Sequence, residues 1–202
     1  MTLEQELEIQ ELLENWRDER HLSIESQRDG LMGNLCEEMA EYYRATNESE
    51  KIDALCDICV FCINSLEDID IKAFRENFSE RIINSNLFTS TKLTTLYLVD
   101  SALKDDIVLD RNKQIYKMIK VCEREIKEMG YDFYKCMMET IKEISSRTGH
   151  YDENIHKFVK DKSDEAKSKW YKADYESCKD IWREYKDFER YATLQDEVIK
   201  VE

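Results

Sequence analysis

The feature that most constrains the fold is a single charged residue inside an apolar stretch. Asp57 is the only charged residue in Ala54–Ile63, whose other members are aliphatic, aromatic or cysteine. Burying an ionised carboxylate without a partner costs several kcal/mol of folding free energy. Asp57 must therefore be neutralised by a proton, paired with a cationic side chain or bound to a metal ion.

The composition favours a helical protein. The 202 residues include no proline and only four glycines, and 37% of them are charged. A formal net charge of −15 repels nucleic acid and anionic membranes, so we exclude both as partners. No run approaches the roughly 18 apolar residues of a transmembrane helix. The composition therefore predicts an all-α protein. Because the N-terminus is acidic and lacks the features of a signal peptide, we also expect the protein to be cytoplasmic.

Apolar residues recur at helical spacing along most of the chain. Helices are predicted at 3–19, 23–45, 47–66, 71–83, 92–103, 111–129, 133–146 and 175–201. Asn47 and Glu50 have the spacing of a capping box at the start of the third helix. The stretch 150–169 is highly charged and poorly periodic, which predicts an extended arm or lid.

Four carboxylates at helical spacing are candidates for one site. Asp53 precedes Asp57 by one helical turn, and Glu38 and Glu41 lie on one face of the preceding predicted helix. If these two helices form an antiparallel hairpin across the turn at 46–49, the two acidic faces meet. Carboxylates presented by two facing helices form a site for hard divalent cations.

Two other interpretations of these acids stay open. Acidic residues are frequent in this chain, so Glu38 and Glu41 taken alone also fit a solvent-exposed helix face. Asp57 also fits an ion pair with a nearby cationic side chain. The candidates for that pairing are Lys51, Arg44 and Arg17.

Seven cysteines in a chain without an export signal favour reduced thiols over disulfides. Cys56, Cys59 and Cys62 have a spacing that also occurs in zinc and iron–sulfur sites. They alternate with apolar residues in a strongly helical segment, so we expect them to be small core residues. A di-iron carboxylate protein would need two Glu-x-x-His motifs, and only 153–156 provides one.

The segments Asn34–Ala45 and Ile52–Phe61 resemble the paired acidic motifs of MazG-like, all-α nucleoside triphosphate pyrophosphohydrolases. This superfamily includes dimeric dUTPases and phosphoribosyl-ATP pyrophosphohydrolases. The resemblance is closest to the phage and bacterial branch and covers residues 23–66, with a weaker similarity after residue 130. It implies a MazG-like helical bundle core with additional C-terminal helices. Residues 1–66 then carry the acidic motifs, 67–129 form a helical insertion, and 130–202 complete the core.

Carried onto this sequence, the resemblance implies a Mg²⁺ site, with Mn²⁺ as an alternative ion. Glu38 and Glu41 would be metal ligands, with one of them accepting a proton from the attacking water, and Asp57 would be the aspartate of the second motif. Ala54 stands where the family usually has glutamate, and Asp53 is the expected substitute. Glu37 is either a base near the metal or a solvent-facing residue.

Substrate contacts are expected from aromatic, amide and cationic side chains. Trp16 and Phe61 fit either stacking on a base or a place in the core. The cationic candidates fit either pyrophosphate binding or an ordinary surface position. The expected substrate-binding residues are Asn34, Lys51, Phe61, Asn64, Trp16, Arg147 and Lys172.

The implied reaction is hydrolysis of a nucleoside triphosphate to the monophosphate and pyrophosphate. Relatives build the base pocket from two subunits, so the resemblance also implies a homodimer. The alternative is a non-catalytic helical interaction protein, in which Ala54 marks a decayed site.

Overall fold

The computed structural model describes residues 1–66, 92–104, 108–154 and 157–180. These residues form helices and one two-stranded hairpin, which confirms the all-α expectation. In chain order the elements are α1 (Leu3–Asp18), α2 (Ile24–Arg44), α3 (Glu48–Asn64), α6 (Lys92–Lys104), α7 (Val108–Glu128), α8 (Phe133–Ser146), β1 (Gly149–Asp152), β2 (Lys157–Lys160), α9 (Asp164–Lys167) and the 3₁₀ turn η1 (Tyr175–Cys178).

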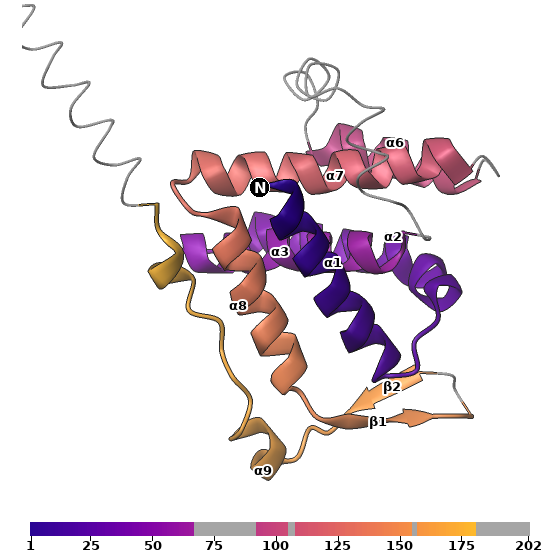
Figure 1. Ribbon diagram of the computed structural model, residues 1–202, viewed down its shortest axis with the longest axis vertical. Helices are drawn as coiled ribbons and strands as arrows, with labels where there is room; N and C mark the ends of the chain where they lie inside the picture. The colour runs from indigo at the N-terminus through magenta and orange to yellow at the C-terminus, as the bar shows by residue number, and fades with distance from the viewer. Residues whose placement is uncertain (67–91, 105–107, 155–156, 181–202) are drawn as a thin grey trace, which may run out of the picture.

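Helix α3 lies at the centre of the protein. It contacts α1, α2, α7, α8 and η1. Figure 1 shows α7 on one side of α3 and the pair α1 and α8 in front of it. Its buried residues run from Ile52 to Asn64 and form the middle of the hydrophobic core. Helix α7 lies in the segment predicted as an insertion, yet it packs directly on α3 in this same core.

Helices α2 and α3 form the expected antiparallel hairpin, since only three residues separate two long helices that contact each other. The Asn47 side chain accepts a hydrogen bond from the Glu50 backbone N–H at 2.9 Å, as a helix N-cap does. The second half of the predicted capping box differs. The Glu50 carboxylate accepts from the Thr46 backbone N–H at 2.7 Å, one residue before the position expected.

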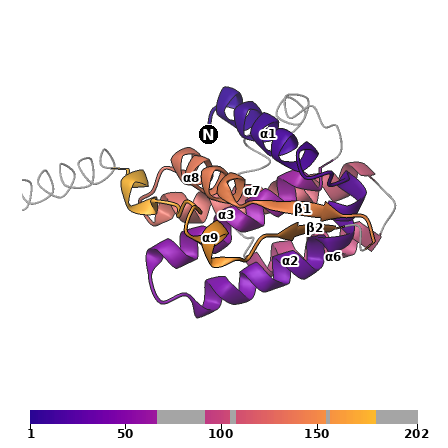
Figure 2. The same ribbon diagram turned by 90° about the horizontal axis from the view of Figure 1, so that it is seen from below.

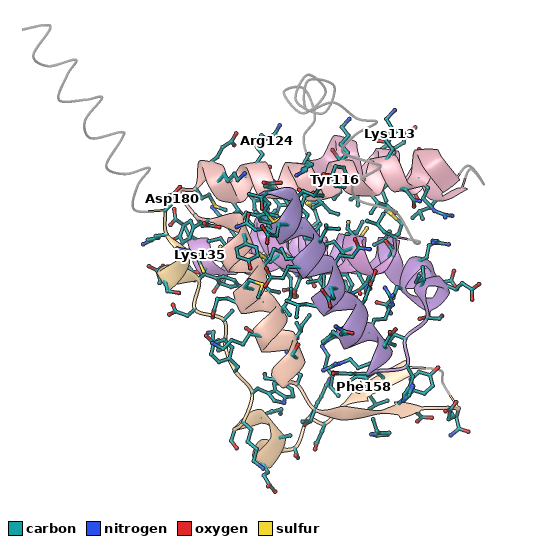
Figure 3. The ribbon with its side chains drawn as sticks, viewed as in Figure 1. Lys113, Tyr116, Arg124, Lys135, Phe158 and Asp180 are labelled. Atoms are coloured by element: carbon teal, nitrogen blue, oxygen red, sulfur yellow. The ribbon has the colours of Figure 1, made fainter. Side chains whose placement is uncertain are left out.

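A buried charge network joins α1 to α7. Lys120 Nζ lies 2.6 Å from Glu6 and 2.8 Å from Glu123. The hydroxyl of Tyr116, which is labelled in Figure 3, donates to Glu6. Burial raises the pKa of Glu123, but Lys120, Lys127 and the N-terminal amine outweigh it and lower that pKa to about 2. The network therefore fixes α1 across the end of the core with its charges paired.

Arg20 joins α1, α8 and the hairpin. Its guanidinium stacks between the rings of Trp16 and Phe158, 4.6 and 5.1 Å from their centres. It also donates to the carbonyl oxygens of Ile144 and Arg147 at 3.4 and 3.3 Å, where α8 ends. Phe158 lies beneath the C-terminal end of α1 (Figure 3), and Figure 2 shows the hairpin crossing this end of the molecule.

The stretch 150–169, predicted as an extended arm or lid, contains a β-hairpin and a short helix. β1 and β2 pair antiparallel with Gly149 opposite Lys160, and the short helix α9 follows. A Cβ atom at Gly149 would lie 2.2 Å from the Val159 carbonyl oxygen, so only glycine fits there. The strands are four residues long, which is too short to show a clear alternating pattern in the sequence.

The other helix predictions agree with the structure to within three residues wherever it describes them. Gly130 follows α7 with a φ of 88°, the left-handed conformation expected after a helix end. The helix predicted at 71–83 lies outside the described residues. Of the helix predicted at 175–201, the described part is the 3₁₀ turn η1.

None of the described helices is long and apolar enough to cross a membrane.

Replacing Arg20 with methionine should destabilise the protein by about 2–3 kcal/mol, because the carbonyl oxygens at the end of α8 lose a charged donor. The free energy of unfolding, measured by urea titration, checks this expectation. Arg44→Met removes an exposed arginine and should change that free energy by no more than about 0.5 kcal/mol. Equal effects of the two substitutions would contradict the role given to Arg20.

Candidate functional site

Helix α3 presents Asp53 and Asp57 on a strip of its surface that its neighbours leave partly open. Both carboxylates are partly exposed, whereas Ala54, Cys56 and Ile58 beside them are buried. The apolar residues around Asp57 are therefore explained by the central position of α3. The carboxylate itself reaches the edge of the core.

Helix α2 brings Glu38 and Glu41 to the same strip. Glu38 is partly buried, and it interacts electrostatically with Asp57, Glu41 and Asp53. Burial, followed by repulsion from Asp57, raises the pKa of Glu38 to about 8. The hairpin thus brings the two predicted acidic motifs together, as expected from their spacing.

Asp57 and Asp53 share this excess of negative charge. Burial and the neighbouring Asp53 raise the pKa of Asp57 to about 7, although Arg147 and Lys160 oppose the shift. Burial also raises the pKa of Asp53, against a hydrogen bond from Tyr175. The raised pKa values show that cationic side chains compensate these carboxylates only in part.

The ion pair considered for Asp57 does not form with the expected residues. Within the described part of the chain, no lysine or arginine nitrogen lies within 4.0 Å of a carboxylate oxygen of Glu38, Glu41 or Asp57. Arg17, one of the expected partners, donates instead to the Asn64 backbone oxygen at 3.5 Å.

The donor set has the chemistry of a hard-cation site, since carboxylate oxygens are the ligands that Mg²⁺ and Mn²⁺ prefer. The positions of these carboxylates do not form a complete set of metal ligands. In the ranges that the structure describes, no three His, Cys, Asp or Glu side chains are placed to hold one metal ion. The four carboxylates therefore interact as neighbouring charges without closing around a common point.

Charged residues of α8 and its C-terminal end act on the acidic cluster, and the sequence analysis found them only in part. Arg147, at the C-terminal end of α8, was expected as a substrate-binding residue, and it does act on the charges of Asp53 and Asp57. Its guanidinium forms an ion pair of 2.5 Å with Glu143, which was missed. The spacing of four residues between Glu143 and Arg147 is the signal that would have indicated this pair.

Lys160 and Tyr175 are the other residues near the acidic cluster that the sequence analysis missed. Lys160 is the last residue of β2, opposite Gly149, and it interacts electrostatically with Asp57, Glu38 and Arg147. Burial and the adjacent positive charge of Arg147 lower the pKa of Lys160. No sequence signal placed Lys160 here, because its position depends on the hairpin register.

The remaining residues that were predicted to bind substrate or metal differ in how far they are buried. Trp16 and Phe61 are partly buried and pack against the hydrophobic core, as the core interpretation predicts. Asn34 and Lys51 are partly exposed. Two further candidates, Glu37 and Lys172, are exposed, and Glu37 adds to the charge that raises the pKa of Glu38.

Asn64 is 1% exposed, and neither its amide nitrogen nor its amide oxygen has a hydrogen-bond partner in the structure as described. A buried amide without partners costs about 1–3 kcal/mol. Such a group is suited to binding a ligand or a water molecule, so Asn64 stays a predicted substrate contact.

The three cysteines of α3 have the expected core position. Cys56, Cys59 and Cys62 are fully buried in helical conformation, and burial raises the pKa of each thiol well above its usual value. The histidine of the Glu-x-x-His motif at 153–156 lies outside the described residues.

No family model matches the chain, and comparisons with curated proteins and with solved structures found no similar protein.

The raised pKa of Asp57 predicts that stability falls as pH rises. Between its unfolded pKa of about 3.9 and its folded value of about 7, the folded protein holds a proton that the unfolded chain has lost. Asp57→Asn should therefore match the wild type near pH 4 and exceed its free energy of unfolding by about 4 kcal/mol at pH 8, since each pKa unit corresponds to about 1.4 kcal/mol.

Urea unfolding at both pH values, with a chelator present to remove divalent cations, measures this difference. Asp29→Asn, at an exposed position of α2, is the matched control and should show no such gain. A gain for Asp57→Asn that does not depend on pH would contradict the expectation.

Proposed function

We propose that this protein is a Mg²⁺-dependent nucleoside triphosphate pyrophosphohydrolase, which converts a nucleoside triphosphate to the monophosphate and pyrophosphate and acts as a homodimer. The observation that carries the proposal is that Glu38 and Asp57 lie close enough to repel each other across a helical hairpin. Each belongs to one of the two segments that resemble the acidic motifs of the family. Within the described residues neither has an ion-pair partner.

The incomplete ligand set is compatible with Mg²⁺. This ion keeps several of its water ligands and is usually held by one or two protein carboxylates together with the phosphates of the substrate. When bound here, Mg²⁺ would neutralise phosphate charge and make a bound water more acidic. Glu38, Glu41, Asp53 and Asp57 would hold it.

The protein's own residues would have separate tasks in the hydrolysis. Glu38 or Glu41 would accept a proton from the water that attacks the anhydride between the α and β phosphates. Burial raises the pKa of Glu38, and this makes its carboxylate a stronger base. Asn64, with its unpartnered buried amide, would bind the sugar or a phosphate.

Arg147 and Lys160 would bind the pyrophosphate as it leaves. A chain of net charge −15 repels a polyanionic substrate. These two cations interact electrostatically with the acidic cluster and with each other. A phosphate group bound there would be stabilised by these cations as well as by Mg²⁺.

The alternative is a non-catalytic helical interaction protein. Two observations favour it: Ala54 occupies the usual glutamate position, and the described carboxylates do not close into a trio of ligands. A protein of this kind would release no pyrophosphate from any nucleotide.

The first test is release of pyrophosphate from a panel of canonical and modified nucleoside triphosphates in the presence of Mg²⁺. Asp57→Asn and Glu41→Gln should each lower kcat/KM by about a hundredfold or more, because a metal ligand or base is lost. Asp29→Asn and Glu25→Gln, at exposed positions of α2, should keep wild-type activity. Unchanged turnover in both site variants would refute the site, and no turnover of any nucleotide would favour the interaction protein.

Lys160→Met should lower kcat/KM about tenfold, the effect of losing about 1.4 kcal/mol of binding to the phosphate groups. Lys167→Met, on the exposed face of α9, is the control that removes the same charge away from the site. Steady-state kinetics at fixed ionic strength compare the two. If both variants behave alike, Lys160 contributes only to the general field of the protein.

A further inference from the structure

Tyr175 contacts the acidic site from a distant part of the sequence. Its hydroxyl donates a hydrogen bond to Asp53 Oδ1 at 2.7 Å, across a separation of 122 residues. Tyr175 is 5% exposed, so this contact is shielded from solvent. Asp53 is the carboxylate expected to replace the glutamate that Ala54 lacks.

Thr140 fixes the Tyr175 hydroxyl from the other side. The two hydroxyl oxygens are 3.0 Å apart, and Thr140 also lies 3.0 Å from the Cys136 carbonyl oxygen within α8. Thr140 is 2% exposed. The phenol oxygen is thus held between α8 and α3, and its position depends on both helices.

The backbone before Tyr175 is also hydrogen-bonded to side chains of α8. The Ala173 N–H donates to Glu143 at 2.8 Å, and the Asp174 N–H donates to Glu139 at 2.9 Å. Asp174 then caps the turn η1 through the Ser177 N–H. In Figure 1 this segment runs alongside α8 to the end of α3 where the acidic site begins, so Tyr175 is placed by a series of specific contacts.

The hydrogen bond leaves one oxygen of Asp53 available. Tyr175 has a single hydroxyl proton, and it goes to Oδ1. Within the described residues Oδ2 has no hydrogen-bond or ion-pair partner. A carboxylate held through one oxygen loses rotational freedom and presents the other oxygen in a fixed direction, as residues behind metal ligands do.

We propose that Tyr175 is a positioning residue, which orients Asp53 so that its free oxygen binds the divalent cation. The proposal rests on the function proposed above. It explains how an aspartate with a short side chain serves where the family that the sequence resembles usually has a glutamate: the C-terminal segment fixes the orientation of the shorter side chain.

The test is Tyr175→Phe, which removes one oxygen and keeps the ring. Binding of Mn²⁺, followed by the electron paramagnetic resonance signal of the free ion, should weaken about tenfold, as a change of about 1.4 kcal/mol produces. Tyr131→Phe is the matched control. Tyr131 is also buried, and its hydroxyl donates to Glu48 at 2.9 Å, so a buried tyrosine hydrogen bond to a carboxylate is lost outside the acidic cluster.

Kinetics separate positioning from structural damage. In Tyr175→Phe the Mg²⁺ concentration for half-maximal turnover should rise about tenfold, and saturating Mg²⁺ should restore most of kcat. Thr140→Val, which removes the second contact of the phenol, should shift both measurements in the same direction by about threefold. Thr140→Val keeps the test available if Tyr175→Phe does not fold.

The outcomes distinguish the two proposals. If the wild type and Tyr131→Phe bind Mn²⁺ while Tyr175→Phe and Thr140→Val bind it equally well, the positioning role is refuted and the enzyme remains. If kcat falls at every Mg²⁺ concentration with unchanged Mn²⁺ binding, the role of Tyr175 is structural and the inference is also refuted. If the wild type binds no divalent cation, the proposed function fails, and the positioning role fails with it.

Discussion

The cost of holding negative charge on the most buried helix governs the arrangement of this protein. Asp53 and Asp57 are carried by α3, which is surrounded by α1, α2, α7 and α8. A carboxylate placed among apolar residues is tolerated only where it reaches solvent, a proton, a cation or a metal ion. The structure leaves one strip of α3 partly open and turns Glu38 of α2 toward it. This gathers charge in one place and keeps the rest of α3 for the core.

The second half of the chain brings other residues to this strip, and buried polar contacts over long sequence distances hold them in place. Arg20 binds the end of α8 and stacks on Phe158 of the hairpin. Tyr175 reaches Asp53 from the segment after the hairpin. Since the hairpin also carries Lys160, the position of a cation beside the acidic cluster depends on the contacts of Arg20, which follows the C-terminal end of α1.

Two cations, Arg147 and Lys160, act on the acidic cluster from the second half of the chain, and they favour the phosphate-bearing substrate proposed above. Four carboxylates lie on α2 and α3, and Arg147 and Lys160 lie on α8 and β2. Arg147 forms a close ion pair with Glu143, whereas in the part of the chain that the structure describes no lysine or arginine pairs closely with Glu38, Glu41 or Asp57. A metal ion with a polyphosphate would compensate the charge of these carboxylates. That arrangement is the physical basis of the proposed hydrolysis.

The sequence by itself determined the helices, their approximate ends and the meeting of the two acidic motifs, because 3.6-residue periodicity and the short turn after α2 are local properties. It also indicated that the cysteines of α3 belong to the core. Only the tertiary structure decided that Glu143, Lys160 and Tyr175 join the site, and that Lys172 stays exposed in solvent. The short strands carried no periodic signal, and the place of Lys160 follows from their register. Contacts such as that of Tyr175 with Asp53 arise only when distant segments pack, so no local pattern encodes them.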